Sequence, residues 1–300
     1  MATAAGLRRR LTDNLWGWFF IFPTVLGLMI LNIIPVFMTI WQSFFKVGDF
    51  GRGNVYVGFA NYMRLISTTE TWQALLNTLV YTFVEVPLSV VIGFIFAIIL
   101  NQKLRGRGFF RTVFFLPMVV APAAVAMVWR YLYNTNYGLL NQILKSLSLA
   151  PVGWISNANL ALFSIAASGI WGSFGYSMVL FLAGLQEIPK DFYEAASIDG
   201  AGFIRQQFIV TIPMISPTLF FITVTRIIAA MQVFDSIFVI LDRYSPVLPR
   251  TQSLVYLFYR YSFIENNRGY GATLVIVLLL VVMLITGIQQ YVQKHWVHYG

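Results

Sequence analysis

Cysteine is absent from this 300-residue sequence, and charged residues are scarce. Without cysteine, a disulfide framework, a thiolate metal site and a cysteine nucleophile are all excluded. Charged residues make up 10% of the chain, whereas a soluble domain carries about 25%. Hydrophobic residues make up 58%, and the mean hydropathy is +0.74. Because so little polar surface is available to cover a soluble globule, we predict an integral membrane protein.

Motifs for catalysis are missing as well. No Gly-Lys pair occurs in the sequence, so the chain has no P-loop with which to hold the phosphates of ATP. Neither G-x-S-x-G nor H-E-x-x-H is present, and the two histidines, His295 and His298, fall in the C-terminal tail. We therefore expect no catalytic residue, metal site or bound cofactor. The net charge of +9 suits anionic lipid headgroups, and the longest basic run, Arg8–Arg10, is too short to predict a nucleic-acid partner.

Long apolar runs are abundant instead. A membrane-spanning helix needs about 20 mostly apolar residues, and the first run is too long for a cleaved signal peptide. These lengths predict an all-α integral membrane protein with six transmembrane helices across residues 16–292, between an N-tail (1–15) and a C-tail (293–300). The predicted spans are Trp16–Phe44, Asn77–Leu100, Phe110–Tyr133, Leu160–Gly184, Met214–Leu241 and Ala272–Val292. Kinks are expected at the prolines inside or at the ends of these spans, which are Pro23, Pro35, Pro87, Pro117 and Pro122.

Six spans put both termini on one side of the membrane. Basic residues gather close to span ends on that side, in the N-tail and in the segment after the second span. The positive-inside rule therefore predicts cytoplasmic termini. The residues concerned are Arg8, Arg9, Arg10, Lys103, Arg105, Arg107 and Arg111.

The cytoplasmic connection at residues 185–212 carries more charge than a simple turn requires. Pro189 at a helix start, acidic Asp191 and Glu194 in the first turn, and Gly200 and Gly202 as stop signals predict a short helix. A second short helix is expected to follow and to end before Pro213. Two short amphipathic helices projecting from a membrane domain favour a helix-in-groove contact with a soluble partner.

This connection also resembles a known motif. Glu194-Ala195-Ala196-Ser197-Ile198-Asp199-Gly200, nine further residues and then Val210-Thr211-Ile212-Pro213 is similar to the EAA loop of ABC-importer permeases. Other matches resemble the carbohydrate-uptake branch, closest to the maltose and glycerol-phosphate type that pairs with a second permease. They are Gly184–Pro189, Phe115–Pro117, Trp129–Asn134, Tyr137–Asn141, Asn77–Leu79 and Gln232–Asp235.

The resemblance implies a type I ABC-importer permease fold and an energy-coupling helix. Glu194 would anchor the partner, the two alanines would permit close approach, and Gly200 would make the turn. The predicted coupling residues are Tyr193, Glu194, Ala195, Ala196, Asp199 and Gly200. The alternative is a solvated linker built of good helix formers.

The resemblance also implies partners and a location. We expect a second six-helix permease, a cytoplasmic ATPase dimer that holds ATP and Mg²⁺, and an extracytoplasmic solute-binding protein, all at the inner membrane of a prokaryotic-type cell. The outer segments long enough to form a docking face are Lys46–Gln73, Asn134–Asn159 and Asp242–Gly271.

The fourth span carries small residues at helical spacing, in the seams Ser164/Ser168/Gly172 and Gly169/Ser173/Ser177. Such seams pack helices closely, and the nearby hydroxyls and aromatic rings also suit a sugar. The resemblance implies pathway positions at Pro122, Gly169, Gly172 and Ala229 besides those we select. The predicted pathway residues are Met118, Trp171, Ser173, Tyr176, Thr225, Arg226, Gln232 and Asp235.

Four ionisable residues fall within predicted spans, where a lone charge costs several kcal/mol. Arg130 is close enough to a span end to snorkel to the membrane surface. Arg226 either contacts substrate oxygens or neutralises a carboxylate. Counting about 1.5 Å per residue places Glu85 nearer in depth to Asp235 than to Arg226, so an Arg226–Glu85 pair is predicted to be strained.

These features predict one subunit of a binding-protein-dependent ABC importer for a sugar or polyol derivative, working by alternating access. A permease of the same type for a non-sugar solute is the nearest alternative. A stand-alone secondary transporter would predict an inverted repeat, which residues 1–150 and 151–300 do not show convincingly. A purely structural membrane anchor would not need the charged loop.

Overall fold

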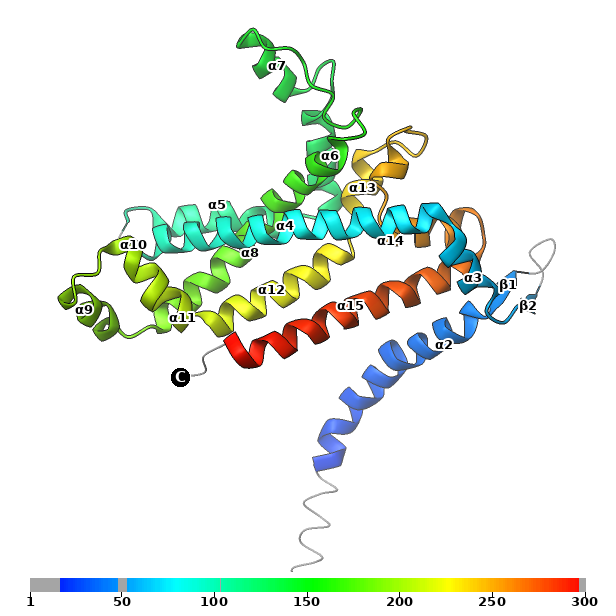
Figure 1. The fold of residues 1–300 in the computed structure, drawn as a ribbon, viewed down its shortest axis with the longest axis horizontal. Helices are drawn as coiled ribbons and strands as arrows, with labels where there is room; N and C mark the ends of the chain where they lie inside the picture. The colour runs from blue at the N-terminus through cyan, green and yellow to red at the C-terminus, as the bar shows by residue number, and fades with distance from the viewer. Residues whose placement is uncertain (1–16, 48–52, 103, 297–300) are drawn as a thin grey trace, which may run out of the picture.

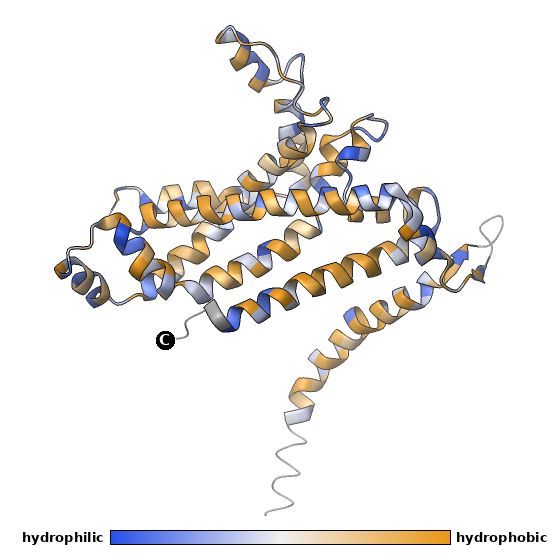
Figure 2. Ribbon diagram, in the orientation of Figure 1, coloured by the Kyte–Doolittle hydropathy of each residue, from blue (hydrophilic) through white to orange (hydrophobic). Residues whose placement is uncertain are grey.

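The computed structural model describes residues 17–47, 53–102 and 104–296, and it is mostly helical (Figure 1). Four helices are long and apolar enough to cross a membrane, and two bent helix pairs bring the number to six. Hydrophobic residues dominate these long helices (Figure 2). The long helices are Gly17–Ser43, α4 (Thr69–Asn101), α8 (Ala161–Glu187) and Arg268–Lys294 within α15 (Arg268–Trp296). Within the first lie one turn of π-helix, η1 (Met29–Ile33), and α2 (Ile34–Ser43). The predicted N-tail, Trp16 and His298 lie outside the described residues.

The third predicted span is not one straight helix. It consists of α5 (Arg107–Val119) and α6 (Pro122–Leu132), which meet at 97°. A proline disfavours the helical conformation in the residue before it, and Ala121 is accordingly extended, with ψ 129°. The kink predicted at Pro122 is therefore present, and hydropathy gave no sign of its size because the apolar run continues across it.

The fifth predicted span, Met214–Leu241, is also broken. A helical lead-in meets α12 (Ser216–Met231) at 73°, where Pro217 lies in the first turn of the new helix. α12 ends at Met231, and α13 (Asp235–Ile240) is a separate short helix. The lead-in comprises α10 (Phe203–Gln206), the π-helical η3 (Gln207–Thr211) and α11 (Ile212–Met214).

The core lies between α4 and α8. A Cβ added to Gly93 of α4 would lie 2.6 Å from Cβ of Ser177 of α8, and one added to Gly169 would collide with the Tyr81 hydroxyl. The seam Gly169/Ser173/Ser177 therefore packs against α4. Gly172 of the other seam has open space beside it within this chain. α4 continues without a break through Pro87.

Chain connectivity defines two sides of the bundle. The α9 side carries α9 (Lys190–Ile198), α10 and the end of α15, and the far side carries the segments that connect on the opposite face (Figure 1). A small antiparallel hairpin on the far side pairs Lys46 with Val55, and the sequence analysis missed it. The far-side elements are β1 (Phe45–Val47), β2 (Asn54–Tyr56), α3 (Ala60–Ser67), α7 (Leu139–Ser146), η4 (Leu248–Arg250), α14 (Leu254–Tyr259) and the π-helical η5 (Arg260–Ile264).

The first span contacts α15 and is otherwise largely exposed. Its most apolar 18-residue window is 0% buried, and Phe37 and Trp41 are 66% and 69% exposed. Figure 1 shows this helix diverging from α15 toward its N-terminal end. Its apolar surface is thus left without cover inside this chain.

Candidate functional site

The predicted helix at the EAA-like motif is present as α9, Lys190–Ile198. Pro189 precedes it in an extended conformation, and Asp191 lies in its first turn. At the other end, the Gly200 amide donates to the Ser197 carbonyl at 3.0 Å and the Ala201 amide to the Ala196 carbonyl at 2.9 Å. This is a Schellman ending, and Gly200 has φ +77°, which glycine adopts at low cost. The start predicted at Pro189 and the stop predicted at Gly200 are confirmed, whereas Glu194 lies beyond the first turn and Gly202 caps α10.

The coupling residues divide between two faces of α9. Ala196 is buried against the core of its own chain, and the Tyr193 hydroxyl lies 3.0 Å from Oγ1 of Thr211 in η3. Glu194 and Ala195 are exposed, as are Asp199 and Gly200 beyond the helix end. Of the two alanines, only Ala195 is therefore free to approach a partner through its side chain. The inner face fastens α9 to the lead-in of α12.

Large apolar side chains surround the exposed face. Ile198 is 87% exposed, and Phe203 and Ile204 of α10 are 57% and 73% exposed. A patch of this kind beside charged residues marks an interaction surface. The sequence analysis missed these three residues, although apolar residues inside a charged loop were the available signal.

A buried ion pair joins three core helices. Arg226 of α12 pairs with Oε1 of Glu85 in α4, and Oγ of Ser173 in α8 donates to the same oxygen at 2.5 Å. Of the two alternatives for Arg226, pairing with a carboxylate is the one that this structure shows. α4 begins at Thr69 rather than at Asn77, so Glu85 lies 16 residues from either end of the helix. Among the described residues, Glu85 Oε2 and Arg226 Nε have no hydrogen-bond partner.

The faces of α12 separate Arg226 from the other predicted pathway residues. Successive residues turn by about 100°, which places Arg226 on the stripe of Ile222 and Ala230, both buried. Thr225 and Gln232 lie on the next stripe, which is more open. Arg226 and Ser173 therefore point into the chain. The other predicted pathway residues, Met118, Trp171, Tyr176 and Asp235, are partly or largely exposed, and Trp171 meets Trp129 edge to face at 5.9 Å.

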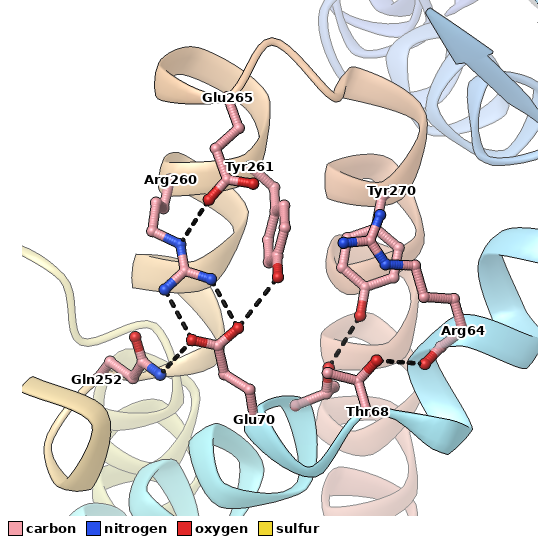
Figure 3. A network of polar contacts seen from close by, with 9 residues as sticks. Arg64, Thr68, Glu70, Gln252, Arg260, Tyr261, Glu265 and Tyr270 are labelled. Atoms are coloured by element: carbon pink, nitrogen blue, oxygen red, sulfur yellow. Dashed lines mark hydrogen bonds and ion pairs between the residues drawn. The ribbon is translucent and has the colours of Figure 1, made fainter.

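A second polar network lies on the far side (Figure 3). Glu70, near the start of α4, accepts two hydrogen bonds from Arg260 of η5 at 2.7 and 2.6 Å, and others from Tyr261 at 3.0 Å and Gln252 at 3.1 Å. Arg260 Nε also lies 3.0 Å from Glu265. The hydrogen bonds that Arg260 donates to Glu70 raise the pKa of Arg260, and burial raises the pKa of Tyr261. Both groups therefore stay protonated at neutral pH.

Residues further along α4 also form hydrogen bonds to the far-side segment at residues 249–254. The Asn77 side chain donates to the carbonyls of Pro249 and Gln252 at 3.2 and 3.0 Å, and the Leu254 amide donates to the Thr78 hydroxyl at 3.1 Å. These bonds connect residues more than 170 positions apart. No local pattern could reveal such pairings, although Asn77-Thr78-Leu79 carried part of the resemblance.

The described residues contain no group of three or more histidine, aspartate and glutamate side chains placed to hold a metal ion. Nothing in this part of the molecule therefore points to a metal centre.

Comparison with known proteins identifies the family. The family described as "Binding-protein-dependent transport system inner membrane component" matches residues 89–298. This chain belongs to that family. A relative of this permease is the trehalose/maltose transport system permease protein MalF of Thermococcus litoralis, 37% identical over 75% of this chain and 76% of that protein. The sn-glycerol-3-phosphate transport system permease protein UgpA of Agrobacterium fabrum is 31% identical over 93% and 94%. The lactose transport system permease protein LacF of Rhizobium radiobacter is 30% identical over 98% and 99%.

The permease fold matches solved structures as well. A chain of a bacterial ABC transporter involved in the import of the acidic polysaccharide alginate superposes with a TM-score of 0.84, covering 96% of this permease and 98% of that chain. The two are 18% identical, so the likeness concerns the fold. The predicted type I ABC-importer permease fold is confirmed.

Proposed function

We propose that this permease is one of two transmembrane subunits of an ABC importer for a sugar or polyol derivative. The observation that carries the proposal is α9, a rigidly capped helix with Glu194 outward and exposed apolar side chains beside it. This is the surface of a helix that docks in a groove of another protein. The names of the relatives, which include trehalose/maltose and lactose permeases, support a carbohydrate solute.

Movement of α9 has a continuous route into the membrane. Tyr193 joins α9 to Thr211 in η3, and η3 continues through α11 into α12. α12 in turn is fastened to α4 and α8 by Arg226, Glu85 and Ser173. An ATPase that closes on ATP and Mg²⁺ would therefore displace α12 against the core and alternate access to the pathway. This chain supplies no P-loop, so hydrolysis belongs to the partner.

The first span and the far side support the remaining partners of the proposal. The uncovered first span supports a second permease, because its apolar face finds no cover within this chain. In this proposal the α9 side is cytoplasmic, the permease lies in the inner membrane, and a loaded solute-binding protein docks on the far side. A related alginate transporter has been solved in complex with a pentasaccharide-bound periplasmic protein, which supports that arrangement.

The charge of the pathway favours a neutral solute. Arg226 is neutralised by Glu85, so it offers no free cation to an anionic solute. Thr225, Gln232 and Tyr176 provide hydroxyl and amide groups, and Trp171 provides an aromatic face. These are the groups that bind sugar hydroxyls and ring C–H surfaces.

The test is affinity capture of the permease from its native membrane, followed by an ATPase assay with a sugar-loaded binding protein. We expect a second permease and an ATPase to be recovered. Glu194→Ala should reduce stimulated hydrolysis at least tenfold, about 1.4 kcal/mol in the coupled step. Glu187→Ala, an exposed carboxylate on the same side but outside α9, should leave it unchanged.

A paired substitution at the end of α9 tests the turn. Asparagine tolerates positive φ and valine does not, so Gly200→Asn should keep coupling while Gly200→Val loses it. A permease that elutes alone without ATPase activity, under conditions that preserve known complexes, would instead indicate a stand-alone carrier.

A further inference from the structure

A cavity of about 510 Å³ lies on the far side, between the end of α6, the loop leading to α7 and the loop after α13. This volume is within the range of small-molecule pockets, roughly 300–1,000 Å³. It lies away from the buried Arg226–Glu85 pair, and none of the predicted pathway residues lines it. The polar and aromatic residues around it include Arg130, Tyr131, Asn134, Tyr137, Ser156 and Asp242.

The walls of this cavity are fixed in place. Asn141 is fully buried and uses its amide group four times, donating to Thr135 and Val152 and accepting from Val152 and Trp154. The Tyr133 hydroxyl donates to the Ser164 carbonyl at 2.6 Å. These bonds hold the loop after α6 in one conformation. A ligand would therefore meet a preformed site and would lose little affinity to ordering it.

The second wall is tied to the first. Arg130 Nη1 donates to the Val239 carbonyl of α13 at 3.1 Å, which joins α6 to α13 beside the cavity. Arg130 is exposed, and this bond gives its head group a defined place near the end of α6. Asp242, just after α13, accepts the Tyr244 amide at 3.0 Å through Oδ1.

Hydrogen-bonding capacity is left over at the rim. Asn134 uses Oδ1 to accept the amides of Asn136 and Tyr137, and among the described residues nothing takes its amide nitrogen. Oδ2 of Asp242 and the remaining N–H groups of Arg130 are likewise without a partner in this part of the chain. Arg130 and Asp242 carry opposite charges, so the site has no net charge to select an ion. Planar amide, carboxylate and guanidinium groups suit pairs of neighbouring hydroxyls.

The aromatic rings complete the pattern. Tyr131 and Tyr137 have ring centroids 5.9 Å apart with planes at 40°, and the rings are 54% and 57% exposed. Exposed tyrosine faces bind flat apolar surfaces while their hydroxyls stay in water. The C–H face of a pyranose ring is such a surface, and its rim of hydroxyls matches the polar groups around the cavity.

We propose that this cavity is an outer carbohydrate subsite, where a pyranose ring stacks on Tyr131 and hydrogen-bonds to Asn134 and Asp242. The proposal rests on the proposed function, because it supposes that the solute is a sugar. The subsite would receive the solute on the far side before it reaches the pathway between the helices.

The test uses the captured complex in lipid nanodiscs, without binding protein. Saturation-transfer NMR with a mixture of maltose, trehalose and lactose at millimolar concentration should show transfer to sugar ring protons. Tyr131→Ala should weaken binding about tenfold, whereas Tyr131→Phe, which keeps the ring, should retain it. Asp242→Asn keeps the acceptor for the Tyr244 amide and should weaken binding several-fold. Tyr244→Ala, an 86% exposed tyrosine of the same loop outside the cavity, is the matched control.

Three outcomes would overturn the proposal. The first is a sugar signal equal in parent and Tyr131→Ala. The second is no sugar signal from a complex that hydrolyses ATP in response to a loaded binding protein. The third is loss of that response in Tyr131→Ala with the sugar signal unchanged, which would make the cavity a protein docking site. Failure to recover any ATPase would instead contradict the proposed function, so the two failures are distinguishable.

Discussion

At the scale of single residues, the charge within the membrane is the strongest constraint. Glu85 is 0% exposed and Arg226 11% exposed, and each would be an uncompensated charge without the other. Ser173 adds a hydroxyl to the same carboxylate oxygen. The pair leaves this part of α4, α8 and α12 electrically neutral, which is why three helices of otherwise apolar surface can contain it.

Removing one member of the pair should be worse than removing both. We expect Arg226→Gln or Glu85→Gln to destabilise the permease by about 3–5 kcal/mol, and the double variant to recover a large part of that loss. Thermal unfolding of the captured complex measures the effect, with Ser173→Ala as a milder control. Equal stability of the parent and Arg226→Gln would contradict a structural role for the pair.

At the scale of elements, the sequence predicted most helices better than it predicted the size and place of their breaks. Hydrophobic length predicted the positions of the spans, and Pro189 and Gly200 predicted both ends of α9 because capping signals are local. The 97° bend lies at Pro122, one of the prolines at which a kink is predicted, whereas its size and the break after Met231 were not predicted. Both ends of α9 were therefore predictable from the sequence.

The far-side network was missed for a different reason. Glu70 meets Arg260 across 190 positions, and its partners lie in a segment that the sequence marked only as a possible docking loop. Likewise, the cavity beside Tyr131 needs two loops that tertiary structure alone brings together. Long-range polar pairings depend on how helices pack, which a single sequence does not encode in any local pattern.

Arg260 pairs with two carboxylates, Glu70 and Glu265, and these allow a matched test of the network. Glu70 is bidentate, whereas Glu265 makes one contact and is 44% exposed. We expect Glu70→Gln to increase amide hydrogen exchange at least tenfold across residues 252–264, and Glu265→Gln to change it little, because exposed pairs are worth about 0–1 kcal/mol. Equal exchange in the two variants would show that Glu70 is not needed to hold the segment. The hydrogen bonds between its backbone and the side chains of Asn77 and Thr78 would then be sufficient.

At the scale of the whole molecule, the permease covers its core but not its first span. Its core is closed around α4 and α8, whereas the first span has no cover over its most apolar window. The α9 side, the first span and the far side thus present three separate surfaces to other molecules. The low share of charged residues fits this exposure, because a span that faces lipid or another subunit must itself be apolar.

The absence of cysteine makes the first span easy to test. Single cysteines placed across residues 30–41, each carrying a photo-cross-linker, should link to the second permease at every third or fourth position, the period of a helix packed on one face. Positions between them should link to lipid. Cross-links to lipid alone at every position would show that this span faces the bilayer on all sides.

During synthesis of the chain, Glu85 is made well before the residues that pair with it. Glu85 emerges from the ribosome 141 residues before Arg226, and Ser173 emerges 88 residues after Glu85. At about 5–20 residues per second, the carboxyl waits roughly 7–28 s for its cation, and the serine hydroxyl is the first of its two partners to be made. A membrane-insertion machine that held α4 beside itself through that interval would spare the nascent permease an unpaired charge in lipid.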